Sequence, residues 1–132
     1  MSILNLMTFV SQYNIEVMNY SKILKIYLFI SGGILIAIGG LTTFHPVAIK
    51  ANEGIQISGN PSALNDVRSF GMLLLATALF SILGSFKSTL RKSASIFTIL
   101  LFLSLGIGRL LSIILDGMPS EGMVKATVIE FV

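Results

Sequence analysis

The chain has 132 residues, of which 54% are hydrophobic and only 11% are charged. Soluble domains carry about 25% charged residues, so this composition excludes an ordinary soluble domain and indicates one small helical bundle in a membrane. The net charge of +3 does not indicate nucleic-acid binding, because the basic residues lie in short clusters beside apolar segments. With no cysteine and a single histidine, His45, we expect no metal site and no cofactor.

Residues 1–21 form an N-terminal extension of uncertain structure. Its larger side chains roughly follow helical spacing, at Ile3, Leu6, Met7, Val10, Val17 and Tyr20. One interpretation is an amphipathic helix that lies on the membrane surface, although such helices are usually rich in Lys or Arg and this segment has neither. The other interpretations are a frayed extension and a natural start at Met18.

The first predicted membrane span covers residues 26–44, after Lys22 and Lys25. Gly33, Ala37 and Gly40 are spaced as one ridge of small residues, along which a second helix can pack closely in lipid. Residues 45–64 follow as a polar connection containing Pro and Gly. Within it, residues 52–62 are compatible with a short turn or hairpin, and we assign them no regular structure.

The second span is predicted over residues 66–86. Ser62, Asn65 and Asp66 are suitable residues for its start, by capping the helix and by complementing its positive end. Small residues recur every seven positions along it, at Gly71, Ala78 and Ser85. This spacing predicts a second small-residue packing face.

Basic residues mark one side of the membrane. Lys22 and Lys25 precede the first span, and Lys87, Arg91 and Lys92 lie in the predicted loop of residues 87–93. The apolar spans predict a multi-pass protein of the inner (plasma) membrane. Loops rich in Lys and Arg remain in the cytoplasm, and this rule gives its orientation. Its N-terminus and the loop of residues 87–93 would be cytoplasmic.

The third span is predicted over residues 95–115 and contains Arg109. At about 100° per residue, Arg109, Ser112 and Asp116 share one face, which Thr98, Phe102 and Leu105 continue inward. That face is expected to point into the bundle. Gly117 and Pro119 then end the helix. Residues 122–132 are expected to form a partial fourth span, truncated in this chain, which completes an all-α antiparallel four-helix bundle.

Half of the remaining charged residues are expected to meet on the side opposite the basic loop. The predicted polar cluster, either structural or ligand-binding, consists of Asp66, Arg68, Arg109, Ser112, Asp116 and Glu130. Two Arg and three carboxylates can neutralise one another there. An unpaired Arg costs about 2.5–3.5 kcal/mol at mid-membrane, so such pairing would stabilise the fold without a catalytic role.

Two motifs carry a family resemblance. The motifs are Asn65-Asp66-Val67-Arg68-Ser69-Phe70-Gly71 and Gly108-Arg109-Leu110-Leu111-Ser112 followed by Asp116-Gly117-Met118-Pro119. With Glu130, they make the chain resemble the small bacterial membrane proteins called domain of unknown function 4345, from about Tyr27 to the last residue. The resemblance implies four spans and no established activity. Ser69 departs from the family pattern, which often has glycine there.

Three classes of function are compatible with the sequence. The first is a structural or interaction protein whose polar cluster fixes helix packing or contacts membrane lipid, another membrane protein or a second copy. The second is binding or transport of a small anionic or lipid-headgroup ligand at Arg68 and Arg109. The third is a membrane enzyme acting on a lipid-like substrate, for which no nucleophile–base pair, phosphate loop or metal motif is present.

Overall fold

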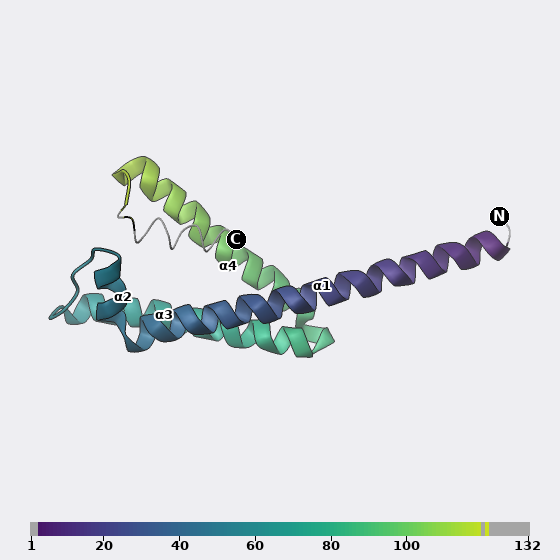
Figure 1. Ribbon diagram of the computed structural model, residues 1–132, viewed down its shortest axis with the longest axis horizontal. Coiled ribbons are helices and arrows are strands. Elements are labelled where there is room, and N and C mark those ends of the chain that lie inside the picture. Colours follow the sequence, from purple (N-terminus) through teal and green to yellow (C-terminus); the bar gives the residue numbers. More distant parts are fainter. Residues whose placement is uncertain (1–2, 120, 122–132) are drawn as a thin grey trace.

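The computed structural model describes residues 3–119 and 121, and this part of the chain is helical with no strand (Figure 1). The helices are α1 (Ile3–Phe44), α2 (Pro46–Asn52), α3 (Pro61–Phe86) and α4 (Ser88–Asp116). Among the described residues, α1, α3 and α4 contain segments long and apolar enough to cross a membrane. The all-α class is therefore confirmed for the described residues, and three of their helices are able to span a membrane by length and composition. The predicted partial fourth span, 122–132, lies outside the described residues.

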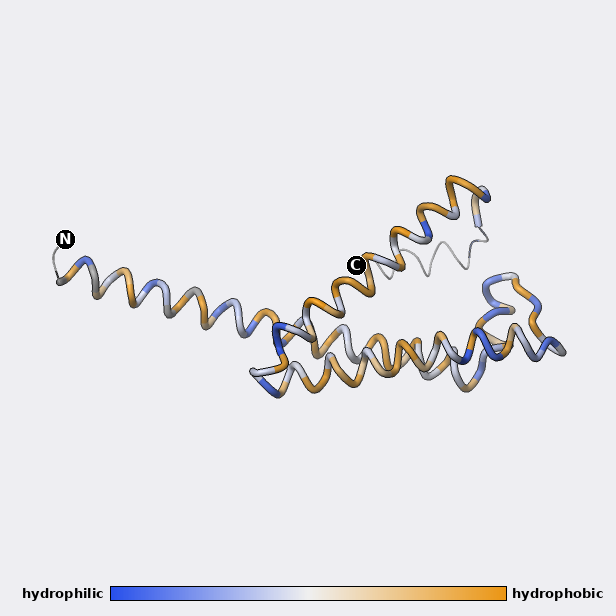
Figure 2. Tube along the Cα trace, turned by 180° about the vertical axis from the view of Figure 1, so that it is seen from behind, coloured by the Kyte–Doolittle hydropathy of each residue, from blue (hydrophilic) through white to orange (hydrophobic). Residues whose placement is uncertain are grey.

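The core of the molecule is the antiparallel contact between α3 and the second half of α1 (Figure 1). Leu28 and Leu35 of α1 and Leu74 and Ala78 of α3 are almost completely buried. Figure 2 shows that hydrophobic residues dominate both helices here, between a hydrophilic turn at one end and the connection at the other. Such apolar segments match a bilayer interior about 30 Å thick.

Glycines let the backbones of α1 and α3 approach each other directly. A Cβ atom added at Gly71 would lie 2.8 Å from the backbone nitrogen of Thr43 and 3.0 Å from the carbonyl oxygen of Gly39. The packing face predicted at Gly71, Ala78 and Ser85 is confirmed, because all three residues are buried.

The prediction that Gly33, Ala37 and Gly40 form the packing ridge of α1 is wrong, because the contacting glycines each lie one position earlier. Ala37 is exposed, and a Cβ added at Gly33 or Gly40 would meet no atom within 4 Å. The glycines that contact α3 are Gly32 and Gly39, which are spaced seven residues apart. Both ridges have spacings compatible with helix packing, so the sequence pattern alone did not separate them.

The connection between α1 and α3 contains more regular structure than the sequence indicated. Pro46 occupies the first turn of α2, and an ion pair joins Lys50 to Glu53 at the end of this helix, with 2.5 Å between Nζ and Oε2. Helix α3 begins at Pro61, earlier than predicted. The side chain of Asn60 caps it by accepting a hydrogen bond of 3.1 Å from the backbone N–H of Ala63.

At the other end, α3 and α4 are joined through Lys87 alone, so most of the predicted basic loop is the first turns of α4. Helix α4 packs on the α1–α3 pair through Ala94, Ser95, Thr98 and Gly106, which are buried. It then diverges from the pair (Figure 1), and none of the described residues beyond Gly106 is buried.

Replacing Gly71 with alanine tests the backbone contact. Gly71→Ala is expected to lower the free energy of unfolding by about 1–3 kcal/mol, because its methyl group would press on backbone atoms that cannot move aside. Gly40→Ala is the matched control, and it should leave stability unchanged or raise it by up to about 1 kcal/mol. Unfolding in detergent, followed by circular dichroism, measures both. Equal stability of the two variants would contradict the assigned interface.

Candidate functional site

Arg91 joins three helices at the end of the bundle where α3 turns into α4. Its Nη1 donates to the hydroxyl oxygen of Ser21 on α1, at 2.5 Å, and its Nη2 donates to the carbonyl oxygen of Ser85 on α3, at 3.2 Å. The Ser95 hydroxyl donates back to the carbonyl oxygen of Arg91 at 2.8 Å. Sequence reasoning treated Arg91 only as a topology signal. The seven-residue series ending at Ser85 placed Ser85 on the packing face near this end, but nothing in the sequence pointed to Ser21.

Buried hydroxyl groups connect α3 to α4 next to this arginine. The hydroxyls of Ser81 and Thr98 are 2.6 Å apart, and both residues are completely buried. The Ser81 hydroxyl also donates a hydrogen bond of 2.9 Å to the carbonyl oxygen of Thr77. Aromatic packing between Phe80 and Phe97 supports the same contact, with ring centroids 6.0 Å apart. Because these hydroxyls bond one another and the backbone, they hold helices together rather than offer a reactive group.

The polar cluster predicted around Arg109 is not a buried network in the described part of the chain. Asp66, Arg68, Ser112 and Asp116 are exposed, and Arg109 is only partly buried. Its predicted partner Glu130 lies outside the described residues. For Arg109, Ser112 and Asp116 the cause is the divergence of α4, which carries them away from the core. Within the face predicted on α4, Ser112 Oγ donates to Asp116 Oδ2 at 3.0 Å.

The residues of the predicted cluster lie on different sides of their helices. On α4, Arg109, Ser112 and Asp116 continue the face of Thr98, which contacts α3. On α3, Asp66 shares the side of Phe80 and Ser81, which contact α4. Arg68 is exposed and lies about 160° from Asp66 around the helix, so it is on a different side of α3. Asp66 and the polar residues of α4 therefore lie on the sides by which α3 and α4 contact each other near the turn, and Arg68 does not.

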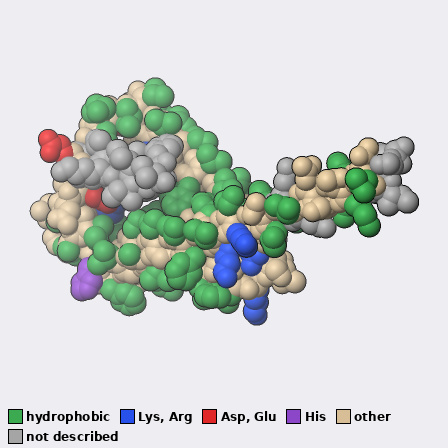
Figure 3. All heavy atoms as spheres, turned by 45° about the vertical axis from the view of Figure 1, so that its right-hand side comes forward, with side chains coloured by type: hydrophobic (Ala, Val, Ile, Leu, Met, Phe, Trp, Pro, Cys, Tyr) green, Lys and Arg blue, Asp and Glu red, His purple; other side chains and the backbone are tan. Residues whose placement is uncertain are grey.

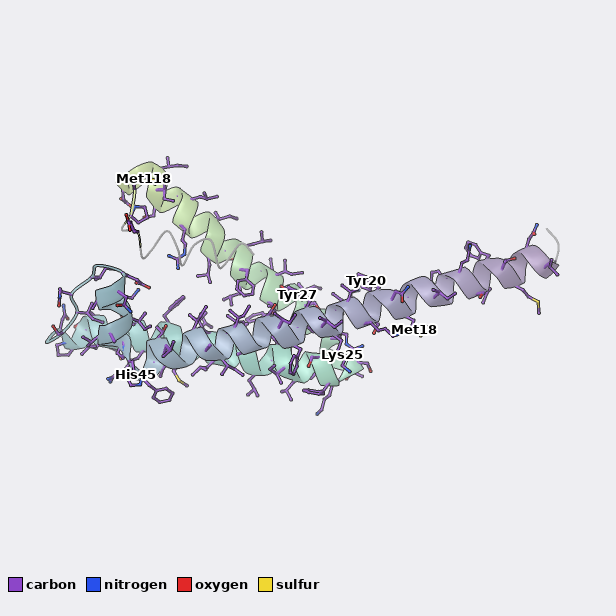
Figure 4. All side chains as sticks on the ribbon, in the orientation of Figure 1. Met18, Tyr20, Lys25, Tyr27, His45 and Met118 are labelled. Carbon is purple, nitrogen blue, oxygen red and sulfur yellow. The ribbon has the colours of Figure 1, made fainter. Side chains whose placement is uncertain are left out.

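The basic residues gather at the opposite end of the bundle. Figure 3 shows Lys and Arg side chains together where α1 passes the turn between α3 and α4, and Figure 4 shows Lys25 in this region. The members of this basic collar are Lys22, Lys25, Lys87, Arg91 and Lys92. Within the described residues, no group of three or more His, Asp or Glu side chains could hold a metal ion.

Comparison with protein families gives one match. A family described as a domain of unknown function, DUF4345, matches residues 23–132. The chain belongs to this family. The resemblance carried by the Asn65–Gly71 and Gly108–Pro119 motifs is thereby confirmed. Comparison with curated proteins gave no significant match, and comparison with solved structures gave none either.

Substituting Arg91 tests its role in this DUF4345 protein. Arg91→Ala is expected to lower the free energy of unfolding by about 1–3 kcal/mol, because it removes charge-assisted hydrogen bonds to both α1 and α3. Arg91→Lys should recover only part of this loss, since an ammonium group lacks the planar fork that reaches both acceptors. Lys92→Ala, which changes an exposed neighbour, is the control. A similar loss in the alanine variants of Arg91 and Lys92 would show that only the local charge matters.

Proposed function

We propose that this protein is a multi-pass protein of the bacterial inner membrane that acts by binding another transmembrane helix rather than by catalysing a reaction. The contact surface is the polar face, defined here as Asp66, Arg109, Ser112 and Asp116. The observation that carries the proposal is the exposure of Asp66, Ser112 and Asp116 on helices whose other side chains are largely apolar.

Polar side chains within a membrane helix are costly in contact with lipid, so they favour a protein neighbour that supplies hydrogen bonds. Carboxylates outnumber the arginine on the polar face, and this balance fits a partner helix that carries a basic residue. The same balance disfavours an anionic ligand, whose charge two carboxylates would repel.

The orientation of the protein belongs to the same proposal. By the positive-inside rule, the basic collar lies in the cytoplasm and the polar face lies toward the opposite side of the membrane. A helix formed by residues 122–132 would return beside α4, complete an antiparallel four-helix bundle and bring Glu130 toward the polar face. The partner helix would then bind at the edge of that bundle.

A photo-crosslinking amino acid placed at Ser112 tests the contact in intact membranes. It should yield one adduct of defined mass, because Ser112 is exposed on the polar face. The same probe at Ile114, which lies about 200° away around α4, should not yield that adduct.

A second pair of variants tests the charge complementarity. Asp66→Asn should reduce the yield of the Ser112 adduct, whereas Arg68→Gln on the other side of α3 should leave it unchanged. Links confined to the chain itself, or an equal effect of these two variants, would show that the polar face serves only the protein's own packing.

A further inference from the structure

The first half of α1 extends beyond the rest of the described fold (Figure 1). The bond from Arg91 to Ser21 marks the point where the turn between α3 and α4 meets α1. Before that point, Ile3–Tyr20 continues as helix for about 27 Å, at 1.5 Å per residue. Its large apolar side chains at Val10, Tyr13, Val17 and Tyr20 are between 49% and 66% exposed.

The spacing of apolar residues in this segment follows a heptad repeat. Seven of its apolar residues alternate at intervals of three and four, at Ile3, Leu6, Val10, Tyr13, Val17, Tyr20 and Leu24, whereas Leu4, Met7, Phe9, Ile15, Met18 and Ile23 lie outside this series. This is the pattern of a and d positions in a coiled coil. The a positions of the first three heptads, Ile3, Val10 and Val17, are all β-branched, as in two-stranded parallel coiled coils, whereas the d positions carry Leu6, Tyr13 and Tyr20.

The remaining positions of the repeat are compatible with such a pair. Asn5, Gln12 and Asn19 recur every seven residues on the opposite side of the helix. Lys22 and Lys25 fall at f and b positions, outside the seam, so two copies do not bring these charges into the contact. The e and g positions carry no like charges that would repel across the seam.

The series of a and d positions from Ile3 to Leu24, called the heptad stripe below, also continues an established interface. Beyond Leu24, the same face of α1 carries Leu28 and Leu35, which are buried against the rest of the bundle. The exposed series in the first half of α1 and the buried residues of its second half therefore lie on one face of the helix. Helix α3 covers this face in the second half of α1. In the first half, the heptad spacing is the one that pairs with another helix of the same repeat.

We propose that the first half of α1 pairs in parallel with the same segment of a second copy of this chain. Two copies inserted in one membrane share their orientation and height, so their stripes meet in register. Because this segment continues a helix that the membrane span already forms, it needs no separate nucleation of its first turn. This proposal is independent of the proposed function, because it concerns a different surface, most of it outside the matched residues 23–132.

Disulfide trapping tests the pairing directly, since the sequence contains no cysteine of its own. Val10→Cys places a thiol in the seam, and Gln12→Cys places one on the polar side. Each full-length variant is reconstituted in liposomes at low density and treated with a mild oxidant. Val10→Cys should form the covalent dimer several-fold more than Gln12→Cys. Equal yields, or no dimer from either variant, would overturn the proposal.

Counting copies in single liposomes by photobleaching of a dye on the chain gives an independent measurement. The unaltered chain should occur mainly as pairs, and Val10→Asp combined with Val17→Asp should make it monomeric. Gln12→Asp combined with Asn19→Asp is the matched control and should keep the pairs.

Thermal unfolding of the membrane domain should be the same in all of these variants, which separates loss of pairing from loss of folding. A monomeric parent chain would overturn the proposal and leave the membrane surface or another protein as the neighbour of this segment. Pairs that persist in the Val10 and Val17 double variant would also overturn it, because another surface would then hold them.

Discussion

The close backbone contact between α1 and α3 is the constraint on which the rest of the structure depends. Lipid tails are as apolar as leucine side chains, so helices in a membrane gain little from burying apolar surface and must pack closely instead. Gly39 and Gly71 allow this by bringing carbonyl and amide groups within van der Waals distance. The contact also aligns Leu35 with Leu74 and Ala78 in the one hydrophobic cluster of the described residues.

Polar bonding adds to this contact at the end where α3 turns into α4. Near the turn, Arg91 joins α4 to both other long helices, and the Ser81–Thr98 pair fixes the first half of α4 against α3. Beyond Gly106, α4 has no buried residue among those described, and it separates from the pair. The fold therefore has a closely packed basic end and an open end that carries the polar face.

The spans could be predicted from the sequence because hydropathy and length are strong signals in a membrane protein. The choice between Gly32–Gly39 and Gly33–Gly40 could not, since α1 is apolar on every side in this region and each pair has a spacing suited to packing. Capping rules also allow the observed start of α3 at Asn60-Pro61. The prediction instead used Asn65 and Asp66, which are suitable start residues further along the chain. The structural role of Arg91 depends on Ser21, a residue distant in sequence, and Arg109 fell short of the expected burial because α4 diverges.

The family match begins almost where α1 leaves the packed part of the molecule. Residues 23–132 include the α1–α3 contact, the Arg91 bonds to α3 and the polar face, whereas Ser21 and the heptad stripe before it lie outside. The part shared with DUF4345 therefore accounts for packing in the membrane, and the preceding helix adds a surface that this packing does not require. Because one face of α1 serves both parts, the orientation that α3 imposes on α1 also sets the direction in which the stripe points. A pairing of stripes would consequently fix the relative rotation of two membrane domains.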